Sequence, residues 1–506
     1  MKRQGILIIV FAVLFALALA AYIIVVRPMT EVVDDEKEEA PETEEGESLG
    51  TQNRFFMFGS LERKDIKRIT VDNEYGGFTF ENDGTGDFYI KGYDTVNFDT
   101  ELFATLVNVS SYTLSKTKVG SNLSAEKLAE YGLTEPRASW TVTDNGGSSY
   151  RVFVGDRLLT GGGYYCQLEG RNSVYVLGID VENTILVPIE AYVTAVLSAG
   201  ISQNDYYLTD DFTVYKKGEQ LFSLRLVDKE EMVNQNAMAE VIMDYPTEYY
   251  PNTTAYYELL YSYMYLAGDS CYKLGATAED FEKTGLKNPE TTITFVYNKA
   301  KYELHFSEKT ENDTYYAYSN LYPNVIAECN AESFRYLEYG LIDWIDEYVF
   351  QQYVTNISEL TISTDKVSAT YDLLHSFASD GDQILDVKVD GEQFSDDQVA
   401  NFRQYYKSFL AIAVQDYYVN DEYCKLTEEE MNALISDKDN AYMTFSYTTL
   451  GGETTELSFF MYSTRHSVVT INGVGEFYVL TDVVKKLEND TVRILNGETV
   501  TAFEKD

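Results

Sequence analysis

The chain has 506 residues, of which 45% are hydrophobic and 14% aromatic, so it can build packed cores and is too long for a single one. It carries 82 acidic and 39 basic residues and has a formal net charge of −43. This composition excludes a disordered chain, and the negative charge makes nucleic acid and anionic lipid headgroups poor partners.

The first element in chain order is an uncharged run of 22 residues from Gly5 to Val26. As an α-helix this run spans roughly 33 Å, enough to cross a hydrocarbon core of about 30 Å. Basic residues precede the run, whereas residues 31–47 hold ten acidic residues and one lysine. The positive-inside rule therefore predicts a single-pass anchor at residues 5–26 of a cell membrane. The N-terminus would be cytoplasmic, within a tip and anchor of residues 1–27, and the body extracytoplasmic.

A cleaved signal peptide is the alternative interpretation of this run. Ala18-Leu19-Ala20 has the small-x-small form of a cleavage site. Residues 23–26 are all aliphatic, however, and prolong the apolar run beyond the core of a signal peptide. We therefore favour the anchor.

Residues 28–54 are predicted to be a linker. They are acidic, contain few apolar residues and include Pro28 and Pro41. Repulsion between like charges extends such a segment. The linker would hold the body away from the membrane.

After the linker, a short capped helix recurs along the chain. Its capping residues are Ser124, Thr277 and Thr427, which are 153 and 150 residues apart. The first two helices end in the same way, at Gly132-Leu133-x-x-Pro136 and Gly285-Leu286-x-x-Pro289. Glycine suits the left-handed position after a helix, leucine packs back on the last turn, and proline prevents the helix from resuming.

Strands and hairpins follow each capped helix at matching offsets. Strands rich in aromatic and β-branched residues are predicted at 139–143, 292–296 and 441–447, and Asn472-Gly473 predicts a tight hairpin turn in the last copy. Ser395-Asp396-Asp397-Gln398 is a capping box that opens a helix to about Leu410. We predict an α+β fold of three tandem modules with mainly antiparallel sheets, at residues 55–200, 201–352 and 353–506, the third divergent.

These motifs resemble the bacterial family of domain of unknown function 4340 (DUF 4340). The resemblance rests on Tyr131 to Pro136, Thr284 to Pro289, Val154-Gly155, and Tyr164-Tyr165 before Val174-Tyr175-Val176. It is closest at residues 66–200, extends over 210–350 and is weak beyond. Proteins of this family look like single-span envelope proteins, and many are similar to partners of ABC-type export systems related to gliding motility. The resemblance implies that association; composition and spacing do not.

One set of motifs has the order used by penicillin-recognising serine acyltransferases: Ser124-x-x-Lys127, Ser202-x-Asn204 and Lys283-Thr284-Gly285. The repeat gives two of them structural roles, because Ser124 caps a helix and Gly285 ends one. We therefore rank the acyl-enzyme hypothesis third.

No other pattern predicts catalysis or a metal site. The four cysteines, Cys166, Cys271, Cys329 and Cys424, are far apart, and H-E-x-x-H and C-x-x-C are absent. Buried free thiols are favoured, although one disulfide remains open. Asp343 and Asp346 could serve as acid and base, but in so acidic a chain solvated surface is the simpler interpretation. We predict no enzyme activity, no cofactor and no metal.

Tyrosines supply the one candidate binding site. Eight lie between Tyr245 and Tyr265, and Tyr249 and Tyr250 sit between two prolines ahead of a helix predicted at residues 254–266. Tyrosine is enriched where proteins meet partners. The alternative is that these rings pack within their own module or loop.

Together these features predict a non-enzymatic, membrane-anchored extracytoplasmic subunit, an accessory or interaction component of an ABC-type transport complex. Its partner would be a membrane protein such as an ABC permease. The alternative is an independent cell-surface adhesin or envelope spacer.

Overall fold

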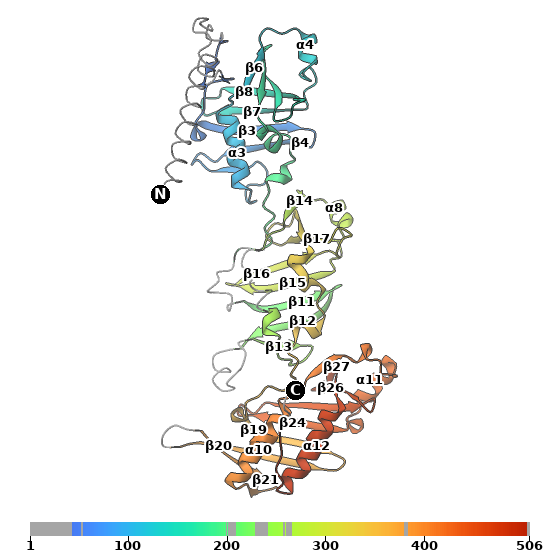
Figure 1. Ribbon diagram of the computed structural model, residues 1–506. Helices are drawn as coiled ribbons and strands as arrows, with labels where there is room; N and C mark the ends of the chain where they lie inside the picture. Colours follow the sequence, from blue (N-terminus) through green and yellow to red (C-terminus); the bar gives the residue numbers. More distant parts are fainter. Residues whose placement is uncertain are drawn as a thin grey trace, which may run out of the picture. The chain divides into compact units, whose positions relative to one another are not determined.

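The structure is a computed structural model that describes residues 43–51, 54–198, 200, 209–227, 241–256, 259, 266–378 and 383–502 (Figure 1). The predicted anchor lies outside these residues, as does part of the helix predicted at 254–266. Within the described ranges no helix has the length and apolar character to cross a membrane. The chain divides into two compact units, residues 1–94 with 100–187, and residues 95–99 with 188–506.

The first unit contains one large sheet and the helices that accompany it. The helices are α3 (Thr100–Ser111), α4 (Ala125–Ala129) and α5 (Asp180–Thr184). The strands are β3 (Ile66–Asn73), β4 (Gly76–Asn82), β5 (Phe88–Ile90), β6 (Thr117–Gly120), β7 (Ala138–Asp144), β8 (Ser149–Arg157), β9 (Tyr164–Leu168) and β10 (Val174–Leu177).

The second unit contains two large sheets. The strands of the second sheet are β11 (Asp210–Lys216), β12 (Glu219–Leu226), β13 (Val241–Tyr245), β14 (Ser270–Leu274), β15 (Thr291–Tyr297), β16 (Ala300–Phe306), β17 (Thr314–Ser319) and β18 (Val325–Asn330). Those of the third are β19 (Ile357–Thr364), β20 (Ser368–Phe377), β21 (Gln383–Val389), β22 (Glu392–Gln393), β23 (Val414–Tyr417), β24 (Met443–Thr449), β25 (Thr454–Met461), β26 (His466–Ile471) and β27 (Val474–Leu480).

Short helical segments and three longer helices connect these strands. The short ones are η4 (Ile189–Tyr192), α8 (Ala278–Lys283), η6 (Ala331–Glu338) and α9 (Leu341–Trp344). The longer ones accompany the third sheet and are α10 (Asp396–Phe409), α11 (Glu428–Ser436) and α12 (Thr481–Leu495).

All three large sheets are antiparallel and share one strand order. The first runs β5-β4-β3-β7-β8-β9-β10-β6, and the second runs β13-β12-β11-β15-β16-β17-β18-β14. The third, β22-β21-β20-β19-β24-β25-β26-β27-β23, repeats the order and adds one strand at an edge. In each sheet the strand that precedes the short capped helix lies at the far edge. The predicted α+β fold with antiparallel sheets is confirmed.

The predicted helix ends form as the repeated motif requires. Gly132 and Gly285 adopt φ angles of +71° and +77°, in the left-handed region that favours glycine. The Leu133 amide donates to the carbonyl oxygen of Leu128 at 3.0 Å, which closes the last turn of α4. Both leucines of the motif are buried, Leu133 at 6% exposure and Leu286 at 1%. The family motif is therefore a structural device.

Aromatic side chains fill the core between each sheet and its helices. In the first unit the ring of Phe103 on α3 lies 4.7 Å from that of Phe80 on β4. In the third sheet α10 and α12 lie side by side over one face (Figure 1), and the hydroxyl groups of Tyr405 and Thr491 join them at 2.6 Å. The predicted capping box at Ser395 opens α10.

Candidate functional site

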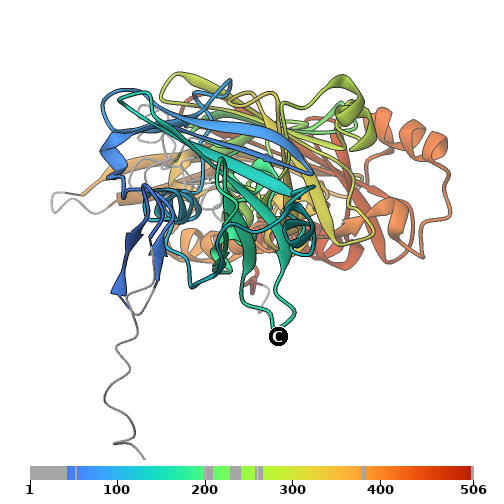
Figure 2. The same cartoon turned by 90° about the horizontal axis from the view of Figure 1, so that it is seen from above.

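The last part of the predicted linker is folded onto the first sheet. Residues 48–49 form β1 (Ser48–Leu49), which pairs with β2 (Phe55–Phe56), the dark-blue arrows in Figure 2. The chain continues as an antiparallel pair, since the Ser115 amide donates to Phe55 at 2.8 Å and the Met57 amide to Thr113 at 3.0 Å. Acidity led us to place residues up to 54 in the linker. From residue 43 onward the described part instead makes specific contacts with the first sheet, partly through its carboxylates, although Ser48 and Leu49 are exposed.

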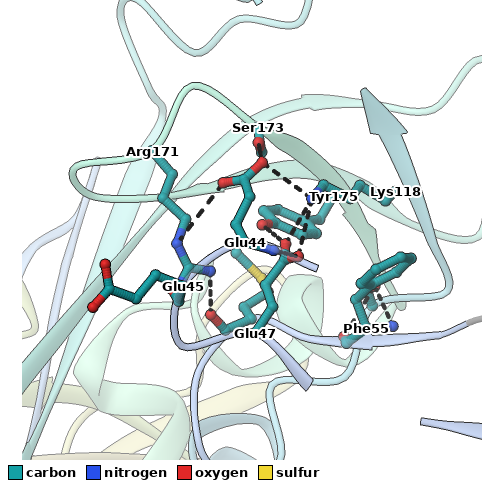
Figure 3. Close-up of polar contacts among 10 residues, drawn as sticks. Glu44, Glu45, Glu47, Phe55, Lys118, Arg171, Ser173 and Tyr175 are labelled. Atoms are coloured by element: carbon teal, nitrogen blue, oxygen red, sulfur yellow. Dashed lines mark hydrogen bonds and ion pairs between the residues drawn. The ribbon is translucent and has the colours of Figure 1, made fainter. Parts of the chain in front are cut away.

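Glu47 is the most buried of these carboxylates. Its side chain is 0% exposed, and Oε1 lies 2.9 Å from Nζ of Lys118, itself only 8% exposed. The hydroxyl group of Tyr175 donates to the same oxygen, and the Glu44 amide donates to Oε2 at 2.8 Å (Figure 3). A buried charge needs an opposite charge and filled hydrogen bonds. Glu47 has both.

Glu44 and Arg171 complete the cluster (Figure 3). Lys118 Nζ lies 3.1 Å from Oε1 of Glu44, and Ser173 donates to the same oxygen. Arg171 donates to the carbonyl oxygen of Met57 at 2.6 Å and to that of Glu45. We name these contacts the carboxylate clasp; its residues are Glu44, Glu47, Lys118, Arg171, Ser173 and Tyr175.

The hydrogen bonds of the clasp favour the charged form of both carboxyl groups. Burial by itself raises the pKa of Glu47, but the donors Tyr175, the Glu44 amide and Lys118 outweigh it and hold that pKa below its usual value. Burial likewise raises the pKa of Glu44, and Ser173 and Lys118 reverse the effect. The clasp is therefore an ion pair near neutral pH.

In the second sheet, the segment that precedes the sheet also contacts the far-edge strand. Val196 forms an antiparallel bridge with Ala267, just before β14. Glu190 on η4 accepts a hydrogen bond from the Leu274 amide at 3.4 Å and lies 3.2 Å from Nζ of Lys273. A glutamate of the incoming segment thus meets a lysine of the edge strand, as in the first sheet.

In the third sheet the preceding segment also pairs with the far-edge strand through its backbone, but a tyrosine hydroxyl group takes the place of the glutamate–lysine pair. Tyr348 forms a bridge with Ala413, directly before β23, and the Val414 amide donates to Glu347 at 2.8 Å. The hydroxyl group of Tyr417 on β23 accepts from the Ile342 amide at 3.1 Å. Each large sheet therefore fixes the chain that leads into it along its far-edge strand.

Metal-ligating side chains and thiols are further candidates for reactive groups among the described residues. Within the described residues no three His, Cys, Asp or Glu side chains gather as ligands for a metal ion. All four cysteines are free thiols, and burial raises the pKa of Cys271 to about 12.

Tyr249 and Tyr250, the sequence-predicted binding residues, contact another part of their own unit. Tyr249 is 3% exposed, and its ring lies 5.5 Å from that of Phe477 on β27. The hydroxyl group of Tyr250 accepts from Gln352 at 2.9 Å. Packing, the alternative interpretation, accounts for both contacts, and binding of an outside partner stays a prediction without support from them.

The described residues of the acyltransferase-like motifs each have a local role. Ser124 accepts a hydrogen bond from the Lys127 amide as the cap of α4. Lys127 Nζ pairs with Glu130 at 2.8 Å on the surface. The hydroxyl group of Thr284 donates a hydrogen bond to the carbonyl oxygen of Asp280 at the end of α8. Ser202 and Asn204 lie outside the described residues.

Asp343 and Asp346 line a cavity of about 730 Å³ but act as local caps. Asp343 accepts from the Gly340 amide at 2.9 Å, and Asp346 accepts from the Tyr348 amide at 2.9 Å. Both carboxylates thus accept hydrogen bonds from nearby backbone amides, which is a local structural role.

Sequence reasoning missed the lysines of the edge strands. A Lys-x-Gly pattern occurs in both cases, at Lys118 to Gly120 and at Lys273 to Gly275, shortly before the capped helix. A basic residue at that place in a strongly acidic chain was the available signal.

A family model described as domain of unknown function (DUF4340) matches residues 101–262 and 271–431, more than half of the chain. No curated protein matches the chain. The matched ranges do not coincide with the sheets. The first omits β3, β4 and β5 but includes β11, β12 and β13, and the second is shifted in the same way.

Proposed function

We propose, from the premise that this chain belongs to the DUF4340 family, that it is a non-enzymatic, membrane-anchored extracytoplasmic subunit. In this proposal it is an accessory or interaction component of an ABC-type transport complex. The family description names no activity, so the argument rests on the carboxylate clasp and on the predicted anchor.

The carboxylate clasp is the observation that carries the proposal. A polymer-like spacer needs no buried contacts at its end, because its length alone separates the body from the membrane. Here a fully buried carboxylate and a lysine, together with backbone pairing, fix residues 43–51 and 54–57 to the first sheet. If residues 5–26 span a membrane, only 17 residues separate the end of that helix from Glu44 of the clasp. Such a connection suits a subunit that works with a membrane partner.

The recurrence of the connection supports the same conclusion. The clasp occupies, at the first sheet, the position that Glu190 and Lys273 occupy at the second. There the connected segment lies within the second unit, whereas at the first sheet it follows the predicted anchor in the chain. We infer that a glutamate paired with an edge-strand lysine is a repeated way of fixing the segment that leads into a sheet. The link to an ABC permease comes from the resemblance alone.

Co-purification tests the proposal. The full-length protein would be tagged at its C-terminus, extracted from its native membranes in mild detergent and isolated. We expect a permease to co-purify. Lys118→Met, which opens the clasp, should lower that recovery, whereas Lys127→Met, which removes an exposed lysine of the same unit, should not.

Three outcomes would count against the proposal. Recovery of the chain alone, as a monomer in mild detergent, would argue against a membrane complex. Recovery with envelope polymer but without a membrane protein would favour the adhesin or spacer alternative. Unchanged permease recovery in the Lys118→Met protein would remove the clasp from the argument.

A further inference from the structure

One lysine of the second sheet lines a cavity and makes no ion pair among the described residues. Lys216 ends β11 and lies opposite Thr291, which begins β15. Its Nζ donates to the hydroxyl oxygen of Thr291 at 2.9 Å and to the carbonyl oxygen of Leu337. Both acceptors are neutral, which is unusual for a half-buried lysine.

The other sheets show that this structural role needs no charge. Asn73 holds the same place in the first sheet, because it ends β3 and lies opposite Ala138, which begins β7. Its side-chain amide donates to the carbonyl oxygens of Ile185 and Val187 at 2.7 and 2.8 Å. In the third sheet the place is taken by Thr364. A neutral side chain therefore suffices at this position of the sheet. The structural role of the position does not explain why the second sheet has an amine there.

The surroundings of Lys216 suit a neutral amine. An uncharged –NH₂ group has two N–H bonds, and Lys216 has two acceptors in hydrogen-bonding reach. The remaining tetrahedral direction then holds a lone pair. Burial lowers the pKa of Lys216, and the charges of Glu290 and Glu338 only partly oppose this. An amine that is hydrogen-bonded to neutral acceptors and has no counter-ion is the kind of lysine that forms Schiff bases.

The cavity has a volume of about 590 Å³ and a mixed charge. Lys217 lies 3.5 Å from Glu290, and Lys309 pairs with Glu338, so the other two lysines are compensated. Glu219 and Glu308 also line the cavity, so four carboxylates disfavour an anionic ligand. Three lysines disfavour a cationic one. A small neutral molecule remains.

We propose that this cavity binds small neutral aldehydes covalently, with the amine of Lys216 as the nucleophile. The nitrogen lone pair forms a bond to the carbonyl carbon as the carbonyl π bond breaks, and one of the two amine protons passes to the carbonyl oxygen, which gives a carbinolamine. Loss of that hydroxyl group with a proton from nitrogen releases one water and leaves an imine. No oxidant or reductant takes part, and the inference is independent of the proposed membrane function.

Reductive trapping tests this site. Full-length protein in detergent would be incubated at pH 7 with propionaldehyde and cyanoborohydride, and the rate of propylation of each lysine followed by peptide mass spectrometry. We expect Lys216 to react at least about fivefold faster than Lys217 and Lys309, which line the same cavity but form ion pairs with carboxylates. Because the comparison is made within one molecule, it does not depend on a variant that folds.

A variant sharpens the result. Lys216→Gln keeps an amide at the position, as Asn73 does in the first sheet, and should lose the fast labelling without a change in the labelling of other lysines. Labelling of Lys216 no faster than that of Lys217 and Lys309 would overturn the proposal. So would fast labelling of the Lys216→Gln protein at another cavity lysine.

Discussion

Removal of the Lys118 charge is the sharpest test of the carboxylate clasp. In Lys118→Met a flexible apolar side chain replaces the lysine stem, while the ammonium group that faces Glu44 and Glu47 is lost. Glu47 is fully buried and would be left without its counter-ion. Breaking a buried pair by removing one partner costs about 3–5 kcal/mol.

The lower end of that range fits this site. Glu47 would keep its hydrogen bonds from Tyr175 and from the Glu44 amide, so its remaining charge would still be partly stabilised. A loss of about 3 kcal/mol corresponds to an increase on the order of a hundredfold in the population of the open clasp.

Hydrogen–deuterium exchange of the full-length protein measures that population. The amides of Met57 and Ser115 belong to the pairing that the clasp secures, and peptides containing them should exchange about a hundredfold faster in Lys118→Met. Lys127→Met is the matched control, because Lys127 pairs with Glu130 at 2.8 Å but is 56% exposed. Such surface pairs contribute about 0–1 kcal/mol.

Two results would refute this reasoning. One is exchange at Met57 that rises no more in Lys118→Met than in the control. The other is a double variant, Lys118→Met with Glu47→Gln, that is no more stable than Lys118→Met alone, since removal of the orphaned charge should recover part of the loss.

Three further predictions concern acidity, close packing and the tyrosine contact. The pKa values of Glu44 and Glu47 are lowered in the folded protein. Their contribution to the free energy of unfolding is therefore complete above the unfolded pKa of about 4.3, and it is lost as pH falls through the folded pKa values. Hydrogen–deuterium exchange measured from pH 6 to pH 3 should show the clasp opening only below about pH 4. Gly155→Ala would place a Cβ 2.1 Å from a backbone oxygen and should lower stability by about 1–3 kcal/mol in thermal unfolding, whereas Gly59→Ala, with open space around it, should be neutral. Tyr249→Ser should destabilise the second unit by about 3 kcal/mol in urea, and unchanged stability would show that its buried ring carries no packing energy.

Much of the fold follows from local sequence signals. The capping residues, the Gly-Leu-x-x-Pro helix ends and the hairpin glycines act within a few residues, so they can be recognised without knowledge of distant contacts. They predicted the repeated helices and the strands that follow, including β7, β15 and β24. The shared strand order was not predicted, because pairing of β3 with β7 joins segments about 70 residues apart.

The clasp could not be predicted from the linker itself. A run of carboxylates is usually solvated, and nothing in residues 43–47 distinguishes Glu47 from its neighbours. Its burial depends on Lys118 and Tyr175, which lie more than 70 residues away. Tyr249 is the converse case, since its aromatic character indicated burial against something and only the structure identifies Phe477 as the contact.

The shift between the matched family ranges and the sheets has a practical consequence for dividing this chain into fragments. A piece cut at residues 101 and 262 would contain β7 without its neighbour β3, and β11 without β15. Each of these two strands, which is central in its complete sheet, would then lie at an edge with unpaired backbone groups. Exposed edges of this kind promote aggregation. Cuts placed between the sheets, as at residues 43–187, keep every strand of the first sheet with its partners. The boundaries of the matched family range and those of the unit that can be expected to fold therefore differ by three strands.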